Sequence, residues 1–171
     1  MPCLICDAAL EPFMNFGRMP IANGFLTAEQ VPHEYFFELA VGFCQPCAMV
    51  QLIEQPDPKM MFHGEYAFFT SSSRAMTAHF QVFAEDVSRE HAAGPDPFVV
   101  ELGSNDGTML ANFAARKVRH AGIEPSANVA EVARQRGVNT VCRFFDPGLA
   151  RELVAEHGQA DAVLAANVMC H

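Results

Sequence analysis

From residue 98 onward, short apolar runs alternate with stretches in which apolar residues recur every three or four positions. The apolar runs predict four strands, over residues 98–102, 118–123, 138–142 and 162–166. The stretches between them predict three helices, beginning near residues 108, 126 and 147. A strand, a helix and a strand repeated three times predict a parallel sheet with right-handed crossovers, and therefore an α/β fold.

The first 94 residues have a different pattern. Residues 1–57 hold short apolar stretches separated by Pro, Gly and Asn, which indicates short strands and turns. Residues 58–94 hold an aromatic connector and then a helix, which Ser72 or Ser73 caps and Gly94 ends. The expected organisation is a small module over residues 1–57, the connector and helix over residues 58–94, and an α/β domain over residues 95–171.

Composition and charge narrow the class of partner. The chain has 20 acidic and 11 basic residues and a formal net charge of −9. Nucleic acid is not expected as a partner, because phosphate contacts need clustered Lys and Arg. No apolar run approaches the roughly 20 residues of a membrane helix, and the N-terminus has neither a basic leader nor an apolar signal core. We therefore expect a cytoplasmic protein with no membrane association.

Four of the six cysteines form two Cys-x-x-Cys pairs: Cys3 with Cys6, and Cys44 with Cys47. Each pair is a tight turn that can present two sulfurs to one ion, and two facing turns complete a tetrahedral shell. Four thiolates leave no ligand position for water, so such a site is structural. Zn²⁺ is the default ion, iron remains open, and free or redox-active cysteines are the alternative.

A glycine loop follows the first strand of the α/β region. Its candidate cofactor-binding residues are Glu101, Gly103, Asn105, Asp106 and Gly107. The glycines stand four positions apart, unlike the Gly-x-Gly-x-x-Gly pattern that binds dinucleotides. The acidic groups would repel a pyrophosphate and suit a cationic, phosphate-free cofactor. The pattern resembles the first motif of class I methyltransferases that use S-adenosylmethionine (SAM).

Further polar residues stand where the later strands end. Glu124, in the segment that ends with Pro125, can accept hydrogen bonds from both ribose hydroxyls. Asp146 resembles the position beside the adenine, and Asn167 ends the fourth strand near the rim of the cofactor site. Each acid alone could be a solvated loop residue, and Asp146 could simply cap a helix. Their shared position favours a SAM site, because ligands of open α/β sheets bind at the carboxyl ends of the strands.

The whole chain resembles one family, the sugar C-methyltransferases that act on nucleotide-linked 4-keto-deoxysugars. Seven segments carry the resemblance in the family's order: Cys3-x-x-Cys6, Asn15-Phe16-Gly17-x-x-Pro20-Ile21-Ala22-Asn23-x-Phe25-Leu26, Cys44-x-x-Cys47-x-x-Val50-Gln51-Leu52, Tyr66-x-Phe68-x-x-Ser71-Ser72-Ser73, Glu101 to Gly107, Gly122-Ile123-Glu124-Pro125 and Ala166-Asn167-Val168-x-Cys170-His171.

The resemblance implies the fold, the reaction and two catalytic residues. The fold is a zinc-binding module followed by a Rossmann-like SAM-binding sheet. A base removes the proton next to the ketone, and the resulting enolate takes the methyl group of SAM. Tyr66 and His171 match active-site positions, although Tyr66, among phenylalanines, could instead be a core residue.

The resemblance also implies a longer protein, because members of the family are roughly twice as long and have more than one domain. A further C-terminal half, carrying the rest of the sheet, is therefore expected. Two alternatives remain open. The chain could be a zinc- and SAM-binding module without turnover, or part of a methyltransferase that acts on another small molecule.

Overall fold

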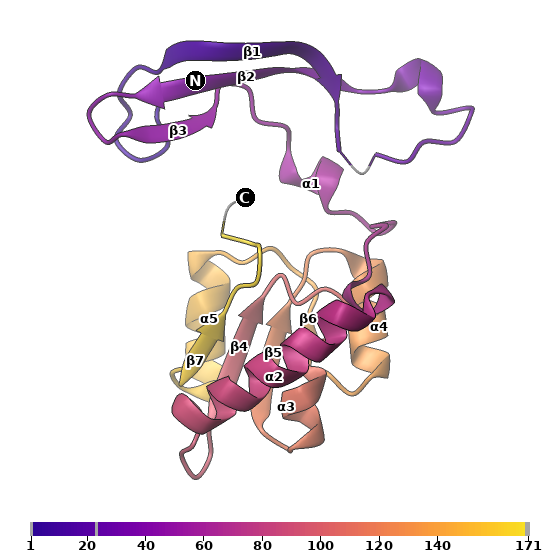
Figure 1. Cartoon of the computed structure of the whole chain (residues 1–171), viewed down its shortest axis with the longest axis vertical. Helices are drawn as coiled ribbons and strands as arrows, with labels where there is room; N and C mark the ends of the chain where they lie inside the picture. Colours follow the sequence, from indigo (N-terminus) through magenta and orange to yellow (C-terminus); the bar gives the residue numbers. More distant parts are fainter. Residues whose placement is uncertain (1, 23, 170–171) are drawn as a thin grey trace. The chain divides into compact units, whose positions relative to one another are not determined.

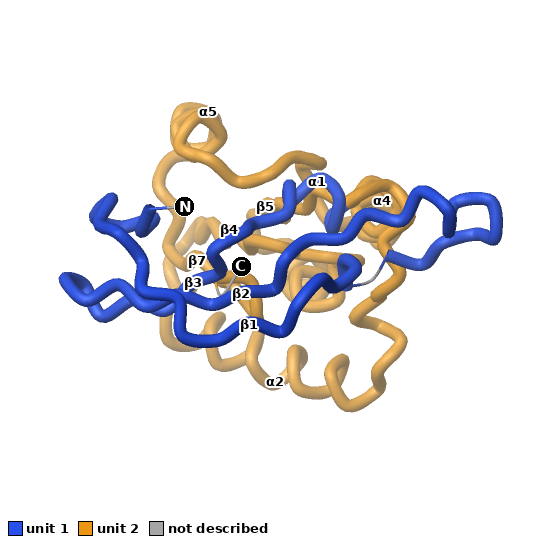
Figure 2. Tube along the Cα trace, turned by 90° about the horizontal axis from the view of Figure 1, so that it is seen from above, with its two compact units in different colours: residues 1–62 blue, residues 63–171 orange. Residues whose placement is uncertain are grey.

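The computed structural model describes residues 2–22 and 24–169 of the chain. It divides the chain into two compact units, residues 1–62 and residues 63–171 (Figure 2). Among the residues described, there is no helix whose length and apolar character would let it span a bilayer.

The first unit is built on a three-stranded antiparallel sheet in the order β1-β2-β3. The strands are β1 (Glu11–Pro20), β2 (Phe36–Cys44) and β3 (Met49–Leu52). The 3-10 helix η1 (Val31–His33) precedes β2, and the short helix α1 (Pro58–Met61) follows β3. The pairing of β1 with β2 shifts register twice, once on each side of Met14 and Asn15.

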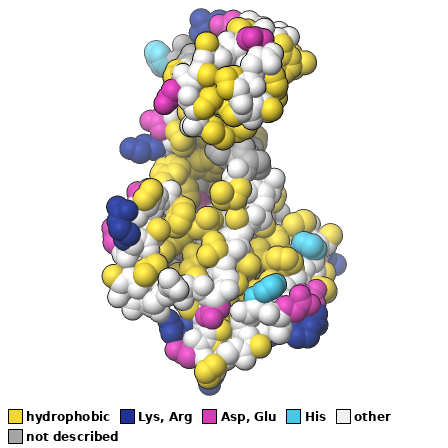
Figure 3. Space-filling model, turned by 90° about the vertical axis from the view of Figure 1, so that its left-hand side faces the viewer, with side chains coloured by type: hydrophobic (Ala, Val, Ile, Leu, Met, Phe, Trp, Pro, Cys, Tyr) yellow, Lys and Arg dark blue, Asp and Glu magenta, His cyan; other side chains and the backbone are white. Residues whose placement is uncertain are grey.

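This unit has little apolar core. Every residue of β1 is exposed, including Phe13 and Phe16, whereas β2 buries Phe37, Ala40 and Cys44. Hydrophobic side chains accordingly lie on much of the unit's surface on the face drawn in Figure 3. A module with so few buried apolar residues needs another source of stability, such as a bound metal ion.

The second unit contains a four-stranded parallel sheet in the order β6-β5-β4-β7 (Figure 1). Its strands are β4 (Phe98–Leu102), β5 (Arg119–Ile123), β6 (Thr140–Val141) and β7 (Ala162–Leu164). The helical elements are η2 (Thr70–Ser72), α2 (Arg74–Glu90), α3 (Ala111–Ala115), α4 (Ala127–Gln135) and α5 (Pro147–His157). The expected α/β fold with a parallel sheet is therefore confirmed.

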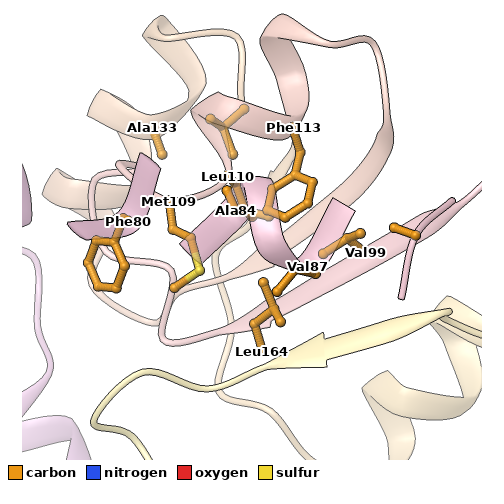
Figure 4. Close-up of a cluster of buried hydrophobic side chains, with 11 residues drawn as sticks. Phe80, Ala84, Val87, Val99, Met109, Leu110, Phe113, Ala133 and Leu164 are labelled. Carbon is orange, nitrogen blue, oxygen red and sulfur yellow. The ribbon is translucent and has the colours of Figure 1, made fainter. Parts of the chain in front are cut away.

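Helices cover both faces of this sheet. On one face, side chains of α2, α3 and α4 pack against β4 and β7; Phe80, Phe113 and Leu164 belong to this cluster (Figure 4). On the other face, Leu149 and Leu153 of α5 pack against alternate residues of β4 and β5. Since side chains alternate along a strand, β4 is apolar on both faces, as buried parallel strands are.

Several elements differ in extent from the sequence prediction. The strand expected over residues 162–166 ends at Leu164, and the helix expected to end at Gly94 ends at Glu90. The expected helix from residue 108 begins only at Ala111, because residues 104–110 turn around Asn105 and Gly107, which have φ angles of +50° and +74°. The third strand, expected over residues 138–142, contracts to Thr140–Val141. It pairs with β5 through two residue pairs.

Candidate functional site

The four paired cysteines come together in the first unit. The sulfur atoms of Cys3, Cys6, Cys44 and Cys47 all lie within 4.8 Å of one another. The Cys3–Cys47 and Cys6–Cys44 sulfur pairs are 3.5 and 3.4 Å apart. Around Zn²⁺ with bonds of about 2.3 Å, tetrahedral sulfurs lie about 3.8 Å apart, so the cluster fits a structural zinc ion.

Hydrogen bonds hold the first cysteine turn in place. The backbone N–H of Ile5 points at the sulfur of Cys3 and is the main cause that lowers the pKa of this thiol to about 6. Buried Gln51 accepts a hydrogen bond from the backbone N–H of Leu4 at 2.9 Å. Gln51 therefore fixes the turn, a role that the sequence pattern alone did not reveal because the partners stand 47 positions apart.

At the end of β5, Glu124 is buried and holds two backbone segments. Its Oε2 accepts the N–H of Asn105 at 2.9 Å, and its Oε1 accepts the N–H of Ser126 at 2.8 Å. Burial raises the pKa of Glu124, while these two N–H groups oppose that rise. A carboxylate has about four acceptor sites, so each oxygen can still accept one hydroxyl, as binding a ribose would require.

Glu101, on β4, is the second buried acid of the site. Its side chain is 4% exposed, and its Oε2 has no hydrogen-bond partner among residues 2–22 and 24–169. Burial, followed by the charges of Glu124 and Asp106, raises the pKa of Glu101 well above its ordinary value. A buried acid with one unpartnered oxygen is suited to a positively charged ligand, which would offset the cost of ionising it.

The side chains of Asn105 and Asp106 bind the connector. Asn105 Oδ1 accepts from the backbone N–H of Thr70 at 2.9 Å, and its Nδ2 donates to the carbonyl of Phe68 at 3.0 Å. Asp106 Oδ2 accepts from the N–H of Ser71 at 3.0 Å. These two side chains therefore fasten residues 68–71 onto the glycine loop.

Asp106 is fully buried and fully partnered. Its Oδ1 accepts the hydroxyl of Thr108 at 2.6 Å, and its Oδ2 lies 3.2 Å from Nη1 of Arg136. Burial alone would raise the pKa of Asp106, but the bonds from Ser71 and Thr108 and the charge of Arg136 lower it. The hydrogen bonds from Ser71 and Thr108, with a smaller contribution from the charge of Arg136, therefore favour the ionised form of this acid inside the loop.

Glycine is required at Gly103. Its φ angle is +63°, and a Cβ atom there would lie 2.5 Å from Cγ2 of Val168, the residue that follows Asn167. The loop therefore passes too close to the segment after β7 to carry a side chain. Gly107, with its positive φ, is crowded as well, since its Cβ would lie 2.9 Å from Cγ2 of Val138.

Tyr66 joins the same site. Its ring is half-buried, and its pKa is raised by burial and by the negative charge of Glu124. The main chain of Tyr66 is bonded to the side chain of Asn128 on α4. The structure thus brings together Tyr66, Glu101, Glu124 and the loop residues Asn105 and Asp106, which are widely separated in the sequence.

The remaining candidates are placed differently. Asp146 is exposed and caps the N-terminus of α5. Its Oδ1 accepts a hydrogen bond from the backbone N–H of Leu149 at 2.8 Å, and this bond is the main cause that lowers the pKa of Asp146. Pro125 is half-buried directly after Glu124, and Asn167 is exposed after β7 with a φ angle of +56°. His171 lies outside the described residues.

These features define a class: an α/β protein that combines a four-cysteine metal-binding module with a four-stranded parallel sheet and an acidic glycine loop. Residues 3–62 match the protein family described as "Putative zinc binding domain". Nearly the whole chain, 99%, aligns with C-methyltransferase NovU of Streptomyces niveus at 29% identity over 172 residues. The resemblance to C-methyltransferases that the motifs indicate is therefore confirmed.

The chain spans 40% of the length of NovU. Two solved structures are also similar. CalS10, a SAM-bound amino pentose methyltransferase from Micromonospora echinaspora, is 30% identical over 49% of this chain and 40% of its own, with a TM-score of 0.35. DesVI of Streptomyces venezuelae is 21% identical over 37% of this chain and 27% of its own, with a TM-score of 0.30.

Proposed function

We propose that this chain is the zinc-binding and cofactor-binding part of a SAM-dependent C-methyltransferase whose substrate is a nucleotide-linked 4-keto sugar. The observation that carries the proposal is the pair of buried acids, Glu101 and Glu124, at the carboxyl ends of two adjacent parallel strands. Similarity to a C-methyltransferase over 99% of the chain supports it.

The residues of the site fit SAM. Glu124 offers each ribose hydroxyl one carboxylate oxygen. Glu101 offers a buried carboxyl group whose raised pKa a bound cation would lower, so that the acid ionises when the ligand binds. Asp106 is already neutralised by Arg136 and therefore shapes the loop rather than attracting the ligand. When bound, SAM supplies an activated methyl group.

Tyr66 is the proposed proton-handling residue of this site. A 4-keto sugar has an acidic C–H next to its carbonyl group, so its methylation needs a base and a hydrogen bond to the carbonyl oxygen. A tyrosine phenol is protonated at neutral pH, and burial and the charge of Glu124 raise the pKa of Tyr66 further, so it is proposed as a hydrogen-bond donor to that oxygen. His171 matches the position of a second proton-transfer residue and is proposed as the base.

Calorimetric titration of the zinc-loaded chain with S-adenosylhomocysteine tests cofactor binding. We expect 1:1 binding, which Glu124→Ala weakens by about 1.5–3 kcal/mol, the contribution of hydrogen bonds to a charged group. Glu131→Ala, which removes an exposed acid of α4, is the matched control and should bind like the parent chain. Equal affinity of a folded Glu124→Ala variant would reject Glu124 as the ribose ligand.

A second titration tests the role of the buried charge. SAM carries a positive sulfonium that S-adenosylhomocysteine lacks, so Glu101→Gln is expected to weaken SAM binding more than S-adenosylhomocysteine binding. Equal loss for the two ligands would mean that Glu101 shapes the loop without attracting the cation. Absence of binding to a folded parent chain would contradict a cofactor site formed by these residues.

A further inference from the structure

Asn128, on the first turn of α4, makes an unusual two-point contact with Tyr66. Its Oδ1 accepts the backbone N–H of Tyr66 at 3.2 Å, and its Nδ2 donates to the carbonyl of the same residue at 2.8 Å. The amide therefore pairs with the main chain of Tyr66 as a neighbouring strand would. Asparagine is suited to this contact, because it presents a donor and an acceptor side by side.

The segment that carries Asn128 also carries Glu124. Ser126 stands between them and donates its backbone N–H to the carboxylate of Glu124. Burial, followed by the negative charge of Glu124, raises the pKa of the Tyr66 phenol. Residues 124–128 thus hold both the proposed ribose ligand and the backbone of the proposed proton donor.

A second amide fixes the connector two and four residues after Tyr66. Asn105 holds the carbonyl of Phe68 and the N–H of Thr70, and its own backbone N–H is bonded to Glu124. Residues 66–70 are therefore attached at two points to groups that surround one carboxylate. These bonds fix the backbone at Tyr66, and with it the point and direction from which its side chain leaves the main chain.

We infer that Asn128 is a positioning residue, which holds the phenol of Tyr66 beside Glu124 and so sets the distance between the proton donor and the cofactor. The inference rests on the proposed function for the role of Tyr66, while the positioning itself is a property of the ligand-free chain. Nothing in the local sequence signals this role, since Asn128 and Tyr66 stand 62 positions apart.

Because the chain has few strongly absorbing side chains, the pKa of Tyr66 can be measured directly. The chain has two tyrosines and no tryptophan, so a Tyr35→Phe background leaves Tyr66 as the single strong chromophore. Ultraviolet absorbance then reports the pKa of Tyr66 in the zinc-loaded chain without any cofactor. In this background, Glu124→Gln is expected to lower the pKa of Tyr66, because it removes the nearby negative charge.

In the Asn128→Ala background, the pKa of Tyr66 is expected to fall toward the ordinary tyrosine value of about 10. In that background, Glu124→Gln should lower the pKa of Tyr66 by less than half as much as it does when Asn128 is present. Asn112→Ala is the matched control: its amide also donates to backbone carbonyls, of Thr108 and Met109, but within its own turn and helix. It should leave both titrations unchanged.

Far-ultraviolet circular dichroism establishes that each variant is folded. If Asn128→Ala does not fold, Asn128→Ser replaces it, because the serine hydroxyl cannot reach both backbone groups of Tyr66. An undiminished effect of Glu124→Gln in a folded Asn128 variant would overturn the inference. Because no cofactor is present, this outcome is separate from a failure of the chain to bind S-adenosylhomocysteine.

Discussion

Replacing Glu101 by glutamine is expected to stabilise the second unit at neutral pH. The folded chain buries this carboxyl group, leaves Oε2 without a partner among the described residues, and raises its pKa well above the ordinary value of 4.5. Glutamine has nearly the same shape and no proton to lose. The substitution therefore removes the cost of keeping an acid in this environment and little else.

The magnitude follows from proton linkage. Because the folded chain holds the proton of Glu101 more tightly than the unfolded chain, unfolding releases this proton and a rising pH favours unfolding. Between the two pKa values, each pH unit costs the parent about 1.4 kcal/mol of unfolding free energy. The advantage of Glu101→Gln should therefore grow by about 1.2 kcal/mol between about pH 5 and about pH 6.

Urea unfolding of zinc-loaded chains in the Tyr35→Phe background measures this difference, because the fluorescence of Tyr66 then reports on the second unit alone. Glu156→Gln is the control: this acid is 75% exposed on α5, and its substitution should change stability equally at both pH values. Parallel stability profiles for the parent and Glu101→Gln would show that Glu101 ionises normally in the folded chain. The electrostatic account of the site would then be wrong.

Three further outcomes can be checked on the same chain. Cys44→Ser should abolish stoichiometric zinc binding and unfold residues 1–62, whereas Cys142→Ser should retain one zinc ion per chain; metal analysis and circular dichroism distinguish the two. Asp146→Ala should lower the melting temperature at neutral pH by about 2–4 °C through loss of the α5 cap, and this difference should disappear as the pH falls through the lowered pKa of Asp146. Gly103→Ala should destabilise the fold by about 1–3 kcal/mol in chemical unfolding, more than Gly137→Ala, because both positions have positive φ angles but only the Cβ at Gly103 meets another side chain.

Local patterns were sufficient to predict the strands and helices of the second unit. The strands and helices around the sheet follow from apolar periodicity, and the cap at Asp146 follows from its position before Pro147. The clustering of the four cysteines also followed from their spacing. The elements and the cap depend on neighbours within a few positions, whereas the cysteine cluster joins distant pairs and was predictable because each Cys-x-x-Cys pair is itself a recognisable metal-binding turn.

The hydrogen-bond partners of the polar residues in the glycine loop could not be predicted from local patterns. Asn105 and Asp106 remain predicted cofactor-binding residues, and the structure adds that their side chains hold the backbone of residues 68–71. Arg136 and Asn128 complete this network from α4 and the residue after it. Each contact joins positions 30 or more apart, and only the packing of the helices on the sheet brings the partners together.

The edge strand β1 has a consequence for the behaviour of the chain in concentrated solution. A long strand that exposes phenylalanines and an unpaired edge invites intermolecular pairing and aggregation. Here prolines stand at positions 12 and 20, and the two register shifts interrupt the regular spacing of its backbone groups. These irregularities act as built-in protection against fibre formation, so a variant with a straight, proline-free β1 would be expected to precipitate sooner than its parent.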